Sequence, residues 1–178
     1  YKEMFEMPYD SFEEIMIKGA ALGFADAPLS EKEPYIIRYA GMIDNWAECD
    51  CFCSCIKVKK SEEVALRLLS ESLMKQKEEF VSRVGIVLMF SRFSDEQTVK
   101  KALDIYDTLP CGEYYRDMAV AWGISVYCVK YPELITTYLE HSPLSITVKL
   151  MAAQKIRDSR RVSNENKLRI TQTVNTQR

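Results

Sequence analysis

The sequence predicts an all-α fold, arranged as a HEAT-like α-solenoid of antiparallel helix pairs with a concave groove. Nearly every segment spaces its apolar residues with the period of a helix, and no segment has both the alternation of a strand and a neighbour to pair with. The helices also recur in pairs of about 33 to 35 residues, a length typical of stacked helical repeats. These pairs cover 10–44, 45–77, 78–110 and 112–142, followed by a half unit. An irregular helical bundle is the structural alternative.

Residues that begin and end helices define the elements in order. Capping side chains precede five of them: Ser11 with Glu14, Ser30 with Glu33, and the single caps Asn45, Ser61 and Asp95. Glu78 and Glu113 open two more, and prolines, which fit a first helical turn, open the last two at Pro132 and Pro143. The predicted helices span 12–23, 31–43, 46–58, 61–76, 78–93, 95–109, 113–130, 132–141 and 143–159, before a polar tail.

Apolar patterning indicates how two of these helices pack. The run Val84–Phe90 is apolar on every side, which predicts that the helix over 78–93 lies at the centre of the fold. In the helix over 61–76, the residues Val64, Leu68 and Leu69 share one face.

Length and composition are those of one globular domain over residues 1–178. No apolar run reaches the roughly 18 residues that cross a bilayer, so no membrane association is expected. The chain opens without a signal peptide, and we expect a cytoplasmic location.

The charge is unevenly distributed along the chain. The formal net charge is −2, which argues against non-specific coating of nucleic acid. From Lys149 onward there are eight basic and two acidic residues, so this end carries +6 and the rest −8. The basic, polar C-terminal segment over 159–178 can therefore bind a polyanion locally, or be a solvated tail.

Four of the six cysteines lie in the run Cys49–Cys55. On a helix, neighbours two apart point to nearly opposite sides, so four thiolates cannot converge on one metal ion. We expect free thiols that pack as small apolar side chains, and no metal site.

The stretch Ile43–Cys55 is the strongest candidate for a site. It places Trp46 four residues before Asp50, so that an indole and a carboxylate share one face of a helix capped by Asn45. Such a pair suits a binding or catalytic surface better than a core. The plain alternative is a Trp in the core beside a solvated Asp.

Stacked repeats would bring further residues beside this pair. The helices that begin near 45, 78 and 112 would then present Trp46, Asp50, Arg83 and Trp122 as one row, with Tyr115 on the face of Trp122. For single residues the alternatives remain open: Trp122 as core, and Arg83 paired with a carboxylate on the adjacent helix.

Four segments together resemble the DNA alkylation repair proteins of the AlkD-like group, which are HEAT-like repeat DNA glycosylases. They are 43–55, 78–93, 114–133 and 152–163, and the similarity runs from about Leu29 to Ser163. Members of that family carry additional N-terminal helices, so the resemblance implies that a first part of the protein is missing here.

The resemblance implies hydrolysis of the N-glycosidic bond of N3- and N7-alkylated purines in double-stranded DNA, by a monomer. The family's W-x-x-x-D motif matches Trp46 and Asp50, and its later Trp matches Trp122; these are the implied catalytic residues. The implied DNA-binding residues are Arg83, Tyr115, Lys155, Arg157, Arg160 and Arg161. By the same resemblance, Arg83 would contact a phosphate or help to place Asp50.

The implied chemistry needs few residues. A cationic alkylpurine leaves without a general acid, and one carboxylate can stabilise the oxocarbenium-like sugar and orient water, with no cofactor. Two features depart from the family pattern: the acidic balance, and Leu150–Met151 where a polar, basic pair is expected. They keep open a non-catalytic HEAT-like scaffold that binds DNA or protein. An unrelated helical adaptor, with Trp46 and Trp122 buried and far apart, is the third possibility.

Overall fold

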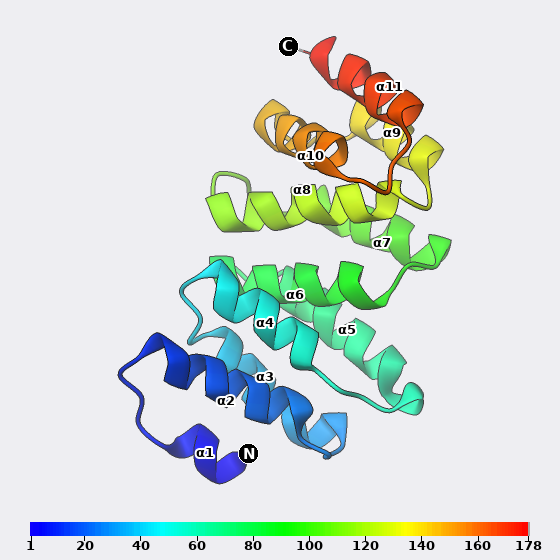
Figure 1. Ribbon diagram of the computed structural model, residues 1–178. Coiled ribbons are helices and arrows are strands. Elements are labelled where there is room, and N and C mark those ends of the chain that lie inside the picture. Colours follow the sequence, from blue (N-terminus) through cyan, green and yellow to red (C-terminus); the bar gives the residue numbers. More distant parts are fainter. Residues whose placement is uncertain (178) are drawn as a thin grey trace. The chain divides into compact units, whose positions relative to one another are not determined.

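The computed structural model describes residues 1–177, and all its regular structure is helical (Figure 1). This confirms the all-α prediction. The described residues form eleven α-helices and one 3₁₀ turn, and none of these helices is both long and apolar enough to cross a bilayer. The chain divides into two compact units, Tyr1–Ser91 and Arg92–Arg178, described separately below. The assignment of 1–178 to one domain stays a prediction.

The first unit is built around α2. Helix α2 packs against α1, α3 and α4, and α3 also packs against α5. Its core is formed by fully buried side chains such as Leu22, Ile36, Tyr39, Phe52 and Leu66. Its elements are α1 (Lys2–Glu6), α2 (Phe12–Phe24), α3 (Leu29–Ala40), α4 (Trp46–Cys55), the 3₁₀ turn η1 (Lys60–Glu62), α5 (Glu63–Met74) and α6 (Glu79–Arg92, whose last residue belongs to the second unit).

The second unit is built around α8. Helix α8 packs against α7, α9 and α10, and α11 packs against α9 and α10. Buried side chains such as Tyr106, Ile124, Ile135, Ile156 and Ile170 form its core. Its helices are α7 (Glu96–Tyr106), α8 (Tyr114–Cys128), α9 (Pro132–His141), α10 (Ile146–Asp158) and α11 (Asn164–Asn175).

Four of the predicted helix starts are confirmed. Ser11 and Glu14 form the predicted capping box: the Glu14 N–H donates to Ser11 Oγ (3.3 Å), and the Ser11 N–H donates to Glu14 Oε2 (3.1 Å). Asn45 and Asp95 cap α4 and α7, and Pro132 opens α9. These helix starts need only neighbouring residues, so the sequence suffices to locate them.

Two predicted caps are wrong, and at one of them a distant side chain takes the place of the cap. Helix α3 begins at Leu29, so Ser30 lies inside its first turn, and the Leu29 N–H donates to Glu62 Oε1 (2.7 Å). Ser61 lies within η1, and α5 begins only at Glu63. Glu62 also accepts from the Lys59 N–H (3.1 Å), so one carboxylate serves two separate backbone segments.

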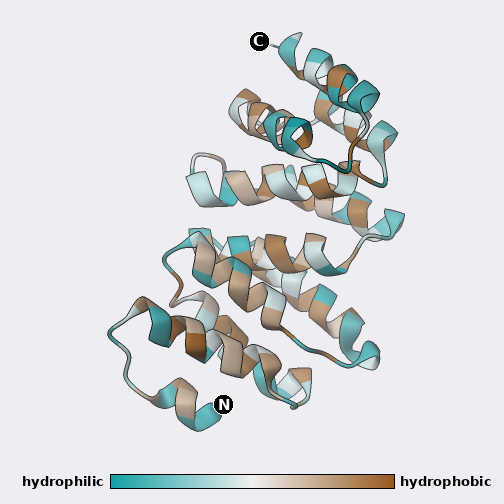
Figure 2. Ribbon diagram, viewed as in Figure 1, coloured by the Kyte–Doolittle hydropathy of each residue, from teal (hydrophilic) through white to brown (hydrophobic). Residues whose placement is uncertain are grey.

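The end of the chain also differs from prediction. Helix α10 begins at Ile146, capped by Ser145, rather than at Pro143. Beyond it, the predicted polar tail contains α11, whose Ile170 and Val174 are spaced by four and fully buried. Figure 2 shows α11 as largely hydrophilic, which explains why composition concealed this helix. Arg178, counted in the basic segment, lies outside the described residues.

Helix α6 confirms the prediction of a central helix. Every residue from Val81 to Phe90 is buried, including the polar Ser82 and Arg83. Gly85 allows α6 to approach α5 closely, since an ideal Cβ at this position would lie 2.6 Å from the Ser70 carbonyl oxygen.

A buried lysine links α2 to the segment that follows α4. Lys32 of α3 is fully buried, and its ammonium donates to the carbonyl oxygens of Gly23 (3.4 Å), Ala25 (3.2 Å) and Lys57. Gly23 and Ala25 lie at the C-terminal end of α2, where unpaired carbonyls accumulate partial negative charge. Lys32 therefore satisfies these carbonyls and helps to hold α4 against α2.

Candidate functional site

Helix α4 places Trp46 and Asp50 on its outward face. Asn45 fixes the start of the helix, since its Oδ1 accepts from the N–H groups of Ala47 (3.0 Å) and Glu48 (3.1 Å). Trp46 is 56% exposed, and the Asp50 side chain is 21% exposed. The opposite face of the helix is buried. The indole is therefore available to a ligand, and it lies one turn before a carboxylate that solvent still reaches.

Arg83 of α6 holds the Asp50 carboxylate. Arg83 Nη2 lies 2.9 Å from Oδ1 and 3.0 Å from Oδ2, and Arg83 Nε lies 3.2 Å from Oδ1. The Arg83 side chain is only 4% exposed. This agrees with the alternative that Arg83 pairs with a carboxylate on an adjacent helix. A guanidinium so buried offers little surface to a phosphate and is placed instead to orient Asp50.

The pairing has an electrostatic consequence. Burying a guanidinium costs free energy unless a carboxylate lies against it. The Asp50 carboxylate therefore stabilises the buried, charged Arg83 side chain. Asp50 is in turn fixed in position while one side stays open to solvent. A rigid, partly exposed carboxylate beside an exposed indole can stabilise a developing positive charge or orient a water molecule.

The cysteines of α4 do not form one cluster. Cys49 and Cys53 are buried, Cys51 is exposed and Cys55 is partly exposed, so the expectation that all four are packing residues is wrong for Cys51. The Cys53 Sγ donates to the Val84 carbonyl oxygen of α6 (3.7 Å), and burial raises the pKa of this thiol well above its ordinary value. Within residues 1–177, no three His, Cys, Asp or Glu side chains gather in a way that could hold a metal ion.

Trp122 and Tyr115 belong to α8 of the second unit. Both are partly buried, and the Tyr115 ring makes an edge-to-face contact with Tyr114, with centroids 5.3 Å apart. Trp122 lies in the middle of α8, where its carbonyl accepts from Ser125 Oγ (2.7 Å). The row that would join these two residues to Trp46 and Asp50 stays a prediction.

The predicted basic residues lie at the end of α10 and just after it. Lys155 is partly buried, whereas Arg157, Arg160 and Arg161 are exposed. Arg157 donates to Gln154 Oε1 and to Thr171 Oγ1 (3.5 Å), which ties it to its own helix and to α11. Arg160 and Arg161 are thus the members of this group whose exposed side chains best suit an anionic partner.

Lys149, the first basic residue of the positively charged end, does not lie at the surface. It is 5% exposed, and its ammonium donates to Gln177 Oε1 (2.7 Å). Burial lowers the pKa of this lysine. Lys149 is therefore a packing residue of the second unit rather than a surface cation.

The Arg83–Asp50 ion pair agrees with one of the two roles that the sequence left open for Arg83, that of placing Asp50. The sequence signal for this pair was an arginine directly before the apolar run Val84–Phe90, one repeat length after Asp50. Val64, Leu68 and Leu69 were predicted to share one face of their helix. Leu69 is buried, but Val64 and Leu68 are exposed.

Comparisons of the chain with models of protein families, with curated proteins and with solved structures each found no match.

Proposed function

We propose that this protein is a DNA glycosylase that hydrolyses the N-glycosidic bond of cationic, alkylated purines. One observation supports this above all: Asp50 is held by the buried Arg83 while it remains partly exposed, one helical turn from the exposed indole of Trp46. A fixed, partly exposed carboxylate beside an exposed indole suits the stabilisation of a cationic sugar.

The proposed reaction uses the fixed carboxylate electrostatically. An N3- or N7-alkylated purine carries a positive charge, so the base departs with the bonding electrons and needs no general acid. The sugar becomes oxocarbenium-like, and Asp50 stabilises that charge and orients the attacking water. The face of Trp46 contributes a favourable surface for the same cationic sugar. Arg83 is a positioning residue in this scheme.

The proposal extends to the architecture that would present DNA. We infer a HEAT-like solenoid of antiparallel helix pairs with a concave groove. In both units, helices two apart in the chain pack together, as α2 does on α4 and α8 on α10, which is expected of stacked helix pairs. Arg160 and Arg161 would contact the phosphate backbone of double-stranded DNA. The protein would act as a cytoplasmic monomer.

A non-catalytic scaffold is the second candidate, and charge favours it. Residues 1–91 hold Trp46 and Asp50, and they carry 11 Lys and Arg against 16 Asp and Glu, a net charge of −5. DNA binding gains most of its affinity from basic side chains near phosphates. An acidic unit around the candidate site is therefore better suited to a protein partner than to DNA.

Release of free 7-methylguanine and 3-methyladenine from methylated DNA tests the proposal. The wild type is compared with Asp50→Asn, with Asp26→Asn as the matched control, because Asp26 is an exposed aspartate on the loop after α2. We expect release by the wild type and the control, and at least a hundredfold loss in Asp50→Asn, in line with removal of one preorganised electrostatic group.

The fold of each variant must be verified, because Asp50 also neutralises a buried guanidinium. Circular dichroism and DNA binding by fluorescence anisotropy serve this purpose. If a folded Asp50→Asn variant releases bases at the wild-type rate, the catalytic assignment is wrong. DNA binding without any release would leave the scaffold as the function.

A further inference from the structure

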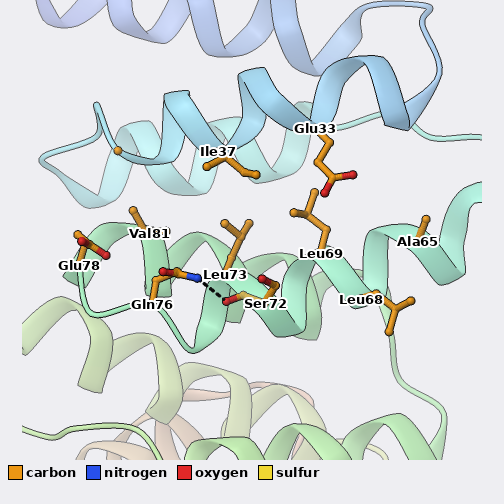
Figure 3. A pocket seen from close by; sticks show the side chains of 11 residues that line it. Glu33, Ile37, Ala65, Leu68, Leu69, Ser72, Leu73, Gln76, Glu78 and Val81 are labelled. Atoms are coloured by element: carbon orange, nitrogen blue, oxygen red, sulfur yellow. Dashed lines mark hydrogen bonds between the residues drawn. The ribbon is translucent and has the colours of Figure 1, made fainter.

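An apolar groove lies in the first unit, away from Trp46, Asp50 and Arg83. It encloses about 640 Å³ between α3 and α5 and extends to the start of α6 (Figure 3). None of the residues that line it belongs to the candidate site. Seven of them are apolar or glycine: Ile37, Gly41, Ala65, Leu68, Leu69, Leu73 and Val81.

Large apolar side chains from two helices are exposed at this groove. Ile37 of α3 is 46% exposed and Leu68 of α5 is 51% exposed, and both line it. Val64, one turn before Leu68 on α5, is 62% exposed. Single exposed apolar residues are common on protein surfaces, but apolar residues gathered around one concavity indicate a binding surface.

The charged residues of the groove are both acidic. Glu78 lies beside Val81 at one end, and Glu33 projects from α3 towards Leu69 (Figure 3). Neither carboxylate has an ion-pair partner within residues 1–177. The other polar members, Ser72 and Gln76, are uncharged, and Gln76 Nε2 donates to the Ser72 backbone carbonyl oxygen (3.3 Å). The groove therefore has an apolar floor and a formal charge of −2 at its margin.

We propose that this groove binds an amphipathic helix of a partner protein, with apolar residues on one face and lysine or arginine beside them. The apolar residues would lie on the exposed Ile37 and Leu68, and the cations would face Glu33 and Glu78. The walls are helices, whose backbone groups are bonded internally, so the groove has no strand edge on which an extended peptide could pair. A helix laid into a groove needs only side-chain contacts and fits both the shape and the charge.

A displayed pool of helical peptides identifies the preferred occupant. Each peptide has leucine at positions i, i+3, i+4 and i+7, and Lys, Glu or Gln varied at the flanking positions. The pool is selected on the full chain. We expect enrichment of peptides with lysine at the flanks. Enrichment of glutamate, or of no peptide, would overturn the proposal.

Matched variants then locate the binding surface by fluorescence anisotropy of a selected peptide. Leu68→Lys should weaken binding by about tenfold or more, as for a central apolar contact. Leu168→Lys is the control, since Leu168 on α11 is a similarly exposed leucine (61%) in the other unit, and it should leave binding unchanged. The double variant Glu33→Gln, Glu78→Gln should weaken binding by about fivefold, as expected for two exposed ion pairs.

Two outcomes would refute the assignment. Equal binding by the wild type and Leu68→Lys would place the peptide elsewhere. A concentration-dependent dimer that Leu68→Lys abolishes, seen by analytical ultracentrifugation, would make the groove an interface between two copies of this chain instead.

Discussion

Gly85 is the position where a single added methyl group should most disturb the first unit. It lies in the middle of α6, two residues after Arg83. An ideal Cβ at Gly85 would lie 2.4 Å from the Met74 backbone nitrogen and 2.6 Å from the Ser70 carbonyl oxygen. Both contacts are with backbone atoms of α5, which cannot rotate away as a side chain can. Gly85→Ala therefore requires α5 and α6 to separate.

The size of the effect follows from these distances. Normal contacts between non-bonded heavy atoms are about 3.5 Å, so the two helices must move apart by about 1 Å. Overpacking of a core costs about 1–3 kcal/mol and occasionally more, and rigid backbone neighbours favour the upper end. Alanine recovers about 1 kcal/mol through its better helix propensity. We expect a net loss of about 2 kcal/mol or more in the free energy of unfolding.

Urea denaturation followed by far-UV circular dichroism measures this loss. Gly41→Ala is the matched control, because Gly41 has an ordinary right-handed conformation (φ −77°) and an added Cβ would lie 3.5 Å from its nearest neighbour, the Arg38 carbonyl oxygen. The control should be unchanged or more stable by up to about 1 kcal/mol. If Gly85→Ala is as stable as Gly41→Ala, the close approach of α5 and α6 at this position is wrong.

Three further predictions concern the site, a buried cation and a titrating group. Trp46→Ala should change the unfolding free energy by less than about 1 kcal/mol, because the indole is 56% exposed. The same variant should lower base release. A large loss of stability would contradict the exposed position of the Trp46 indole. Lys32→Met should lower the unfolding free energy by about 2–3 kcal/mol in urea denaturation, since it leaves buried carbonyls unsatisfied; an unchanged midpoint would refute this. Burial raises the pKa of Asp107. The contribution of Asp107 to stability is thus fully present below the ordinary pKa of an aspartate, and it is lost as pH rises through the higher folded-state pKa. Over that pH range, the wild type should therefore lose stability relative to Asp107→Asn. A stability difference between the two proteins that does not change with pH would refute this prediction.

The features that the sequence alone determined are those that depend on neighbouring residues. The helical period, the Ser11–Glu14 capping box and the Asn45 cap were correct because a helix and its cap are formed within a few residues. The burial of α6 was also predictable, since a helix that is apolar on every side has no stable place at a surface. The common face of Trp46 and Asp50 follows from their spacing of four in the same way.

Only the tertiary structure decided the features that depend on distant residues. Leu29 is capped by Glu62, and Asp50 is held by Arg83, and each contact joins segments more than 30 residues apart. The exposure of Leu68 and the burial of Lys149 were equally hidden, because they depend on which helix packs against each face. The sequence gives the chemical nature of each side chain. Its partner and its exposure to solvent depend on how the helices pack, and local sequence patterns do not determine that packing.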